Sequence, residues 1–168
     1  MTDHADDVEA LPRLAFNTLE RHIGRIIATS DWTRVEQHEA DAFADITGDP
    51  DPMHIDPDWA AAAGPYGRTV VAGMHMMSLL PRMTRGAGLS IDGVRLPMNY
   101  GFNRVRFVSA LPIGSRFRNL VELKSVERRL DGAALITTLN TFQVENEARP
   151  ALVAEWVNLL WPEREGGA

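Results

Sequence analysis

Two residues that can transfer protons, Asp49 and His54, lie close together in this 168-residue chain. An Asp-Pro-Asp-Pro run begins at Asp49, and His54 follows it after a single methionine. Histidine titrates near neutral pH, and a neighbouring carboxylate can orient its ring or act with it on one water molecule. The pair therefore indicates an acid/base site, and the alternative is an ordinary turn that carries a partly exposed histidine.

The acidic residues around this pair also raise the question of a metal site, since Asp49, Asp51, His54 and Asp56 could all be ligands. A calcium loop that began at Asp49 would need glycine at its sixth position and glutamate at its twelfth. This chain has His54 and Ala60 there, which excludes such a loop and leaves zinc or manganese as an alternative. We expect no metal and no other cofactor.

An apolar segment opens with Ala72 and Gly73 and contains no charged residue before Arg82. The first N–H groups of a helix that began there would be partly positive, and glycine allows a ligand to approach the backbone closely. The amide of Gly73 is therefore a candidate donor to an oxyanion. Tight packing of the helix against a strand would explain the same glycine.

Several further residues could contact a substrate without reacting with it. Methionines can line an adaptable acyl pocket, although core packing explains most of these positions equally well: Met74, Met76, Met77, Met83 and Met98. Arginines could meet a phosphorylated ligand or form the solvated face of two strands: Arg104, Arg106, Arg116 and Arg118. We assign Met74, Met77, Arg104 and Arg106 to substrate binding. We expect His75 to be a packed, hydrogen-bonded residue of the core.

The pattern of residues 37–47 predicts the helix that positions Asp49. Apolar residues recur there at helical spacing, and Gly48 gives a C-terminal stop. The prolines that follow cannot lie inside a helix, because proline lacks a donor and restricts the residue before it. Asp49 and His54 are therefore expected on one stiff loop.

The remaining elements predict an α+β fold. An apolar helix over residues 72–83 has no polar face, as is usual for a helix buried at the centre of a domain. The other expected elements are a helix over 14–22, a strand over 26–35, a helix over 59–63 capped by Asp56 or Asp58, and strands over 98–108, 116–128, 133–144 and 152–160. The economical arrangement is one curved antiparallel sheet wrapped around the long apolar helix. Its exposed edge strands need cover, so we expect a homodimer in which two sheets join edge to edge.

Composition bounds the class of protein. The length predicts one domain, over residues 13–162, with loose tails at 1–12 and 163–168. The absence of cysteine excludes disulfide and thiol chemistry, and the net charge of −6 argues against a nucleic-acid partner. The N-terminal residues lack the apolar core of a signal peptide, and no apolar run is long enough to span a membrane. We therefore expect a cytoplasmic protein without a membrane partner.

The hydratase motif of the MaoC-like, (R)-specific enoyl-CoA hydratases resembles a set of short segments in this chain: Phe43-Ala44, Thr47-Gly48-Asp49, Pro52-Met53-His54, and Gly73-Met74 followed by Ser78. The run NYGFNRVRF at 99–107 and the run SDW at 30–32 are similar to the nodulation-protein-N branch of that family. The resemblance covers residues 24–161, which is nearly the whole predicted domain.

This resemblance implies a hot-dog fold, in which a sheet wraps around a central helix, and assembly as a homodimer. It implies that Asp49 and His54 activate one water, which adds to the β-carbon of a trans-2-enoyl-CoA while a proton reaches the α-carbon. The product would be the (R)-3-hydroxyacyl-CoA, and the reaction would be reversible. The amide of Gly73 would stabilise the thioester oxygen, and Asp51 and Ser78 would support the site.

Two positions depart from the family pattern, with Asp51 where asparagine is usual and Ala72 where histidine is common. An ionised aspartate only accepts hydrogen bonds, whereas asparagine also donates. A hot-dog acyl-CoA thioesterase is the alternative enzyme, but it commonly has a carboxylate on the central helix, and residues 74–83 contain none. A non-catalytic acyl-binding module is the third possibility, which the change at Asp51 keeps open.

Overall fold

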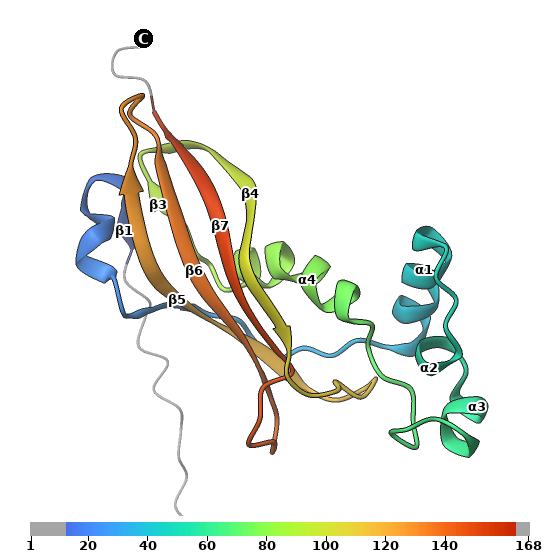
Figure 1. The fold of residues 1–168 in the computed structure, drawn as a ribbon. Coiled ribbons are helices and arrows are strands. Elements are labelled where there is room, and N and C mark those ends of the chain that lie inside the picture. Colours follow the sequence, from blue (N-terminus) through green and yellow to red (C-terminus); the bar gives the residue numbers. More distant parts are fainter. Residues whose placement is uncertain (1–12, 164–168) are drawn as a thin grey trace, which may run out of the picture.

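Five antiparallel strands form the main sheet of the computed structural model, which describes residues 13–163. The strand order is β2-β5-β6-β7-β4, and Figure 1 shows these strands as a curved layer. Their bounds are β2 Ile26–Thr29, β4 Val94–Phe107, β5 Phe117–Arg128, β6 Ala134–Val144 and β7 Leu152–Pro162. A separate parallel pair joins β1 (Leu14–Ala15) to β3 (Ile91–Asp92). The predicted α+β class and antiparallel sheet are confirmed.

Burial along β6 shows which face of the sheet carries the core. Every second residue of this strand is buried, from its first to its last. The same side of β5 and β7 contributes Phe117 and Trp156, and these residues cluster with Met76 and Leu80 of helix α4 (Gly73–Gly86). The concave face of the sheet therefore packs against α4, as expected for a sheet wrapped around a helix.

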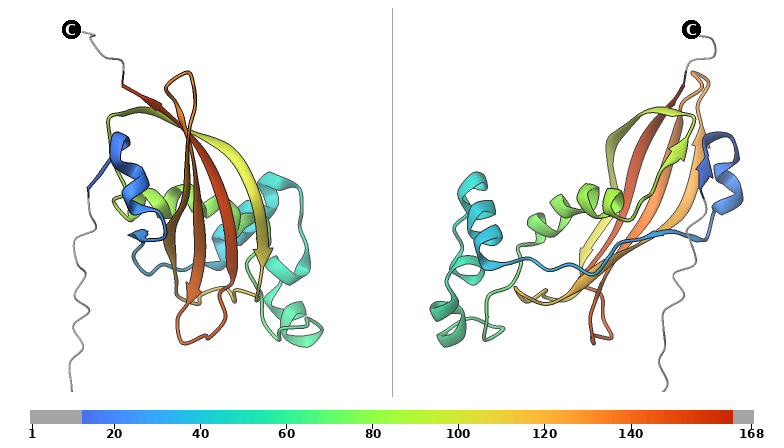
Figure 2. Two further views of the ribbon diagram at one scale, coloured as in Figure 1. Left: turned by 60° about the vertical axis from the view of Figure 1, so that its left-hand side comes forward. Right: turned by 180° about the vertical axis from the view of Figure 1, so that it is seen from behind.

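Helix α4 is amphipathic in a single chain, which corrects the prediction of a helix buried all round. Its buried side chains are His75, Met76, Leu80 and Met83. Its other side is open, because Met74 is 66% exposed and Ser78 and Arg82 also lie at the surface. Figure 2 shows the reason, since the sheet of one chain covers α4 from one side only.

Three short helices form an arm beyond the N-terminal end of α4, and Figures 1 and 2 show them set apart from the sheet. They are α1 (Gln37–Thr47), α2 (Pro52–Ile55) and α3 (Pro57–Ala62). The predicted α1 is confirmed, and it ends at Gly48, whose φ of 68° is a left-handed conformation that glycine adopts readily. Asp56, one of the two candidate caps, accepts a hydrogen bond from the Trp59 N–H at 2.9 Å and begins α3.

Helix α2 corrects the expectation that Asp49 and His54 share one loop. Pro52 occupies its first turn, where a missing N–H has no consequence because that group has no partner within a helix. His54 therefore lies on a helical turn, while Asp49 stays on the link between α1 and α2.

The strand expected over 26–35 is shorter than predicted and ends at Thr29. Ser30 explains the break, because its Oγ accepts a hydrogen bond from the Asn119 N–H at 2.9 Å and takes the place of a backbone carbonyl. Beyond this point Thr33 pairs again with Phe117, as a single bridge.

Two further differences concern the first predicted helix and the start of β4. The helix expected over 14–22 is a 3-10 helix, η1 (Phe16–His22), and β4 begins at Val94 rather than at residue 98. The predicted tails at 1–12 and 163–168 lie outside the described residues except for Glu163, and the domain boundaries stay a prediction. None of the helices described is long and apolar enough to cross a membrane.

Candidate active site

Asp49 is placed by the end of α1. Its N–H donates to the Ala44 carbonyl at 3.1 Å, and the preceding Gly48 lets the chain turn out of the helix. The residue is exposed, and no hydrogen bond from the described chain restrains its carboxylate. The backbone of Asp49 is therefore fixed, while its side chain is available to a ligand.

Asp51 has a structural role that the sequence does not reveal. Its Oδ1 accepts a hydrogen bond from the Met53 N–H at 2.8 Å and so caps α2. Aspartate and asparagine are about equally good at this position, because each offers the same acceptor oxygen. The departure from the family pattern therefore leaves the local fold intact.

His54 is fixed by a hydrogen bond between its ring Nδ1 and the Val70 carbonyl oxygen, at 2.7 Å. A carbonyl only accepts, so Nδ1 carries the hydrogen, and the other ring nitrogen of a neutral imidazole is left unprotonated. The Val70 N–H returns a bond to the Met53 carbonyl at 3.2 Å. Because Val70 lies three residues before Gly73, these bonds hold the half-buried His54 beside the start of α4.

Gln37 completes this framework, and the sequence analysis missed it. Its Nε2 donates to the His54 carbonyl at 2.8 Å, and its Oε1 accepts from the Thr69 Oγ1 at 2.8 Å. One side chain thereby joins α1, α2 and the segment that leads into α4. No local signal could have identified this glutamine, because its partners lie 17 and 32 residues away along the chain.

Gly73 is the first residue of α4, so its N–H has no partner within the helix. A Cβ at this position would lie only 2.7 Å from the Phe107 ring. Glycine is thus required for close packing against β4, which was the alternative explanation of this residue. The free amide and the close packing coexist in the structure.

His75 lies in the first turns of α4 and stacks on Phe43 of α1, with ring centroids 4.6 Å apart and planes 2° apart. Its burial is confirmed, but its Nδ1 has no hydrogen-bond partner in the described chain, which corrects the expectation of a hydrogen-bonded ring. Burial lowers the pKa of His75, and the nearby Glu39 carboxylate opposes this effect. The stack fastens the arm to α4.

The other predicted residues of α4 are Ser78, Met74 and Met77. The Ser78 Oγ donates to the His75 carbonyl at 2.7 Å, so this serine is bonded to its own helix. Met74 is largely exposed, whereas Met77 packs against the core. No bond from Ser78 to Asp49 or His54 is present in the described chain.

The arginines assigned to substrate binding lie on the outer face of the sheet. Arg104 and Arg106 pair with Glu155 and Val153 of β7 and line a shallow hollow of about 300 Å³. Arg116 and Arg118 both lie over the ring of Trp32, at 5.6 and 4.7 Å from its centre. Within one chain these four arginines do not meet Gly73 or His54, because the sheet separates its outer face from α4.

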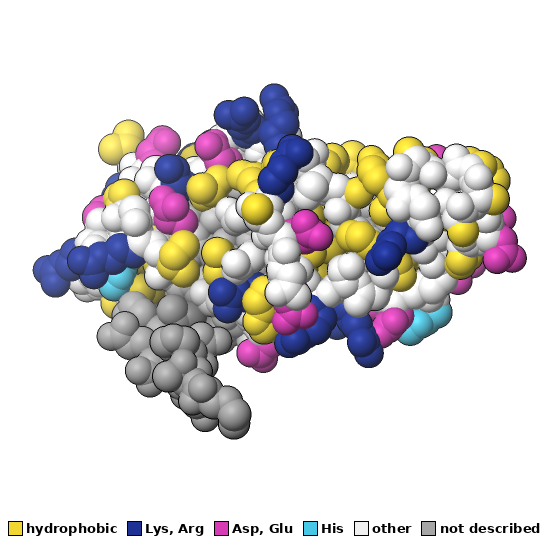
Figure 3. All heavy atoms as spheres, turned by 90° about the horizontal axis from the view of Figure 1, so that it is seen from below, with side chains coloured by type: hydrophobic (Ala, Val, Ile, Leu, Met, Phe, Trp, Pro, Cys, Tyr) yellow, Lys and Arg dark blue, Asp and Glu magenta, His cyan; other side chains and the backbone are white. Residues whose placement is uncertain are grey.

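The charged side chains and the potential metal ligands also bear on the kind of site that this chain can form. Figure 3 shows basic and acidic side chains interspersed with apolar ones over the face seen from below. Within residues 13–163, no three His, Asp or Glu side chains are grouped so that they could hold a metal ion. The candidate residues His54 and Gly73 lie at the N-terminal end of α4.

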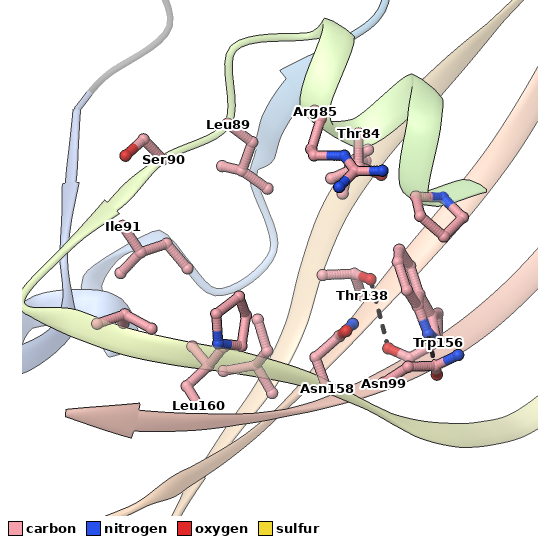
Figure 4. Close-up of a pocket in the computed structure, with 15 residues that line it drawn as sticks. Thr84, Arg85, Leu89, Ser90, Ile91, Asn99, Thr138, Trp156, Asn158 and Leu160 are labelled. Carbon is pink, nitrogen blue, oxygen red and sulfur yellow. Dashed lines mark hydrogen bonds between the residues drawn. The ribbon is translucent and has the colours of Figure 1, made fainter. Parts of the chain in front are cut away.

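A cavity of about 410 Å³ lies at the other end of α4, and Figure 4 shows its lining. Pro81, Thr84 and Arg85 of α4 contribute to it, together with residues of strands β3 to β7 and the segment before β3. Asp49, His54 and Gly73 are not among its lining residues. The candidate acid/base residues and this cavity therefore lie towards opposite ends of α4.

Comparison with known proteins places this fold in one class, the hot-dog MaoC-like dehydratases. The (R)-hydratase from A. caviae involved in PHA biosynthesis is 26% identical, with a TM-score of 0.62 over 78% of this chain and 91% of that chain. A MaoC-like dehydratase from Rhodospirillum rubrum has the same fold at 17% identity, with a TM-score of 0.69 over 82% of this chain and 91% of the other.

The family model of the MaoC like domain matches residues 18–144, so this chain belongs to the MaoC-like dehydratase family. The 3-hydroxyacyl-thioester dehydratase Z of Mycobacterium tuberculosis is 42% identical over 132 residues, covering 79% of this chain and 86% of that protein. Nodulation protein N of Rhizobium leguminosarum bv. viciae is 36% identical over 148 residues, covering 88% and 91%. These findings confirm the suspected family and branch, and they support a hydratase or dehydratase role.

Proposed function

We propose that this protein catalyses the reversible hydration of a trans-2-enoyl-CoA to the (R)-3-hydroxyacyl-CoA in the cytoplasm. The observation that carries this proposal is the bond from His54 Nδ1 to the Val70 carbonyl, which in a neutral ring makes the other nitrogen the proton acceptor beside the start of α4. A neutral imidazole in this tautomer is a base suited to water. The dehydratase relatives support the choice of reaction.

In the proposed reaction, Asp49 and His54 bind one water between them. The water oxygen bonds to the β-carbon of the enoyl group, and the pair takes a proton from it and passes one to the α-carbon. The carbon–carbon double bond is consumed, and one molecule of water is added in total. Negative charge develops on the thioester oxygen during this step, and the free N–H of Gly73 is the donor proposed to stabilise it. Removal of one such donor typically costs about 3 kcal/mol of transition-state stabilisation.

The free edge of the sheet supports the proposed homodimer. In the described chain β4 pairs with β7 alone, so its other edge is unpaired over a strand of 14 residues. Large apolar side chains are exposed on this strand, namely Leu96, Met98, Tyr100 and Phe107. Such an edge is a ready template for another strand. We propose that a second copy of β4 pairs with it.

Antiparallel pairing of two β4 strands along their length would set Phe107 opposite the partner's Val94. Phe107 contacts Gly73 at the candidate site, and Val94 is part of the cavity lining. The twofold arrangement would therefore bring the site of one protomer to the cavity of the other. We propose that the cavity receives the acyl chain of a thioester bound at the partner's site.

Incubation with enoyl-CoAs of increasing chain length tests the function. The proposal predicts loss of the enoyl absorbance and formation of the (R)-3-hydroxyacyl-CoA, with no free CoA. Release of free CoA would instead identify the thioesterase alternative, and an unchanged thioester at every chain length would identify an acyl-binding module.

A further inference from the structure

The cavity beside the C-terminal half of α4 has apolar walls and a polar floor. Binding of an unsubstituted alkyl chain during the proposed hydration would not require polar groups on the floor. Leu89, Ile91 and Leu160 are among the walls. Asn99 and Asn158 form the floor, and Figure 4 shows them side by side on neighbouring strands.

Both asparagines have hydrogen-bonding groups that have no partner in the described chain. The indole N–H of Trp156 donates to the Asn99 Oδ1 at 2.7 Å, and because an indole only donates, this contact assigns the amide oxygen. The NH₂ group of Asn99 is therefore left to donate elsewhere. The half-buried side chain of Asn158 forms no hydrogen bond within the described chain.

Two residues of α4 add to this polar character. The Oγ1 of Thr84 is buried and has no hydrogen-bond partner in the described chain. Arg85 is exposed at the cavity, and no salt bridge among residues 13–163 uses its guanidinium. A buried polar group is normally paired, so the unpaired Thr84 Oγ1 favours a ligand that pairs with it. The exposed Asn99 and Arg85 and the half-buried Asn158 offer further donors around the same cavity.

We infer that the cavity binds an acyl group whose far end carries a hydrogen-bond-accepting oxygen, as a hydroxyl or a carboxylate does, in preference to an unsubstituted alkyl end. The inference rests on the proposed function for its account of why an acyl chain enters. The walls fit the apolar body of the chain, while Asn99, Asn158 and Arg85 offer donors to its end. An alkyl end would desolvate these donors without pairing them, and sites built on hydrogen bonds discriminate strongly against such analogues.

The test compares three enoyl-CoAs of equal chain length, ending in a methyl, a hydroxymethyl or a carboxylate group. We expect kcat/KM to be at least about tenfold higher for an oxygenated end than for the methyl end. Equal values, or a preference for the methyl end, would overturn the inference. A preference for the carboxylate that Arg85→Gln removes would identify Arg85 as its partner.

Asn158→Leu supplies the matched variant, because it keeps a similar volume and removes the polar amide. It should lower kcat/KM for the oxygenated ends towards the value for the methyl end, so that the preference is lost. Thr137→Leu is its control, since Thr137 lies on the outer face of β6 opposite Val157 and should keep the preference. An unchanged preference in Asn158→Leu would contradict the assigned floor.

Binding of the corresponding saturated acyl-CoAs, measured by calorimetry, separates this inference from the proposed function. A protein that hydrates nothing but binds the oxygenated ends more tightly would refute the function and retain the inference. An active enzyme with no preference in rate or binding would support the proposed function and refute the inference.

Discussion

The ring of Phe107 lies directly over Gly73, so that a Cβ at residue 73 would come within 2.7 Å of the ring. This contact joins the last residue of β4 to the first residue of α4, beside the amide proposed as the oxyanion donor. The ring is 48% exposed and can swing aside, which decides how the enzyme should respond to a larger residue.

Gly73→Ala should therefore reduce activity far more than stability. Alanine favours helix by up to about 1 kcal/mol over glycine, which offsets the displacement of the half-exposed ring. A misplacement of the site on the order of 1 Å can cost about 100-fold in rate. Melting temperature and kcat/KM measure the two effects. In a Phe107→Ala background the same substitution should cost much less activity, and strictly additive losses would contradict the coupling of the two residues.

Asp51 should be replaceable by asparagine without loss of activity or stability. Its observed role is to cap α2, and both residues provide the acceptor for the Met53 N–H. Asp51→Ala removes the acceptor and should lower the free energy of unfolding by about 1 kcal/mol. Urea denaturation of both variants gives the comparison. A large loss of activity in Asp51→Asn would show that the carboxylate itself acts in the reaction.

His75 should make the protein less stable in mild acid. Its pKa is lowered from 6.5, chiefly by burial, so the unfolded chain binds a proton more readily than the folded one. Stability from the neutral ring is complete above 6.5 and is lost as pH falls from 6.5 through the lower pKa of the folded state. The groups that face the ring are Phe43, Glu39, Arg82 and His54.

His75→Phe retains an aromatic ring for the stack with Phe43 and removes the titration. The free energy of unfolding should fall less in this variant than in the wild type between about pH 8 and about pH 5. Urea denaturation at the two pH values measures this difference. Since His54 and Glu39 are present in both proteins, an identical pH dependence would show that His75 does not contribute to it.

Tyr100→Glu tests the pairing of β4 with a second copy. Tyr100 is 61% exposed near the middle of the strand, where a twofold pairing would set the introduced carboxylates close together. We expect a shift from dimer to monomer in light scattering, together with a loss of hydratase activity. Leu130→Glu is the matched control, because Leu130 is fully exposed in the β5–β6 turn, away from this edge. A dimer that survived Tyr100→Glu unchanged would argue against this interface.

The sequence predicts those parts of the fold whose signals are local. Helix α1 and its stop at Gly48, and strands β5, β6 and β7, follow from periodicity and turn residues within short windows. The missed helix α2 spans only four residues, and its cap at Asp51 looks like any acidic turn. Strand β2 ends early because a single side chain, Ser30, replaces a backbone acceptor, and spacing does not reveal this.

The candidate site likewise has residues that the sequence predicts and supporting contacts that it does not. Asp49, His54 and Gly73 are recognisable from residue type and motif, whereas their supports depend on contacts across the fold. Gln37 reaches Thr69, and Phe107 reaches Gly73, over 32 and 34 positions. The outward direction of Arg104 and Arg106 likewise follows from the register of β4 on β7, which a single sequence does not give.

The central claim is that Asp49 and His54 together activate water beside the N-terminus of α4. The most direct measurement is the rate of hydration of a short enoyl-CoA, followed by its absorbance, for the wild type, Asp49→Asn and His54→Ala. General acid/base groups contribute about 10²- to 10⁴-fold, so each variant should lose at least about 100-fold in kcat while keeping its circular dichroism spectrum and its dimer. A folded His54→Ala protein that hydrates the substrate at the wild-type rate would contradict the account.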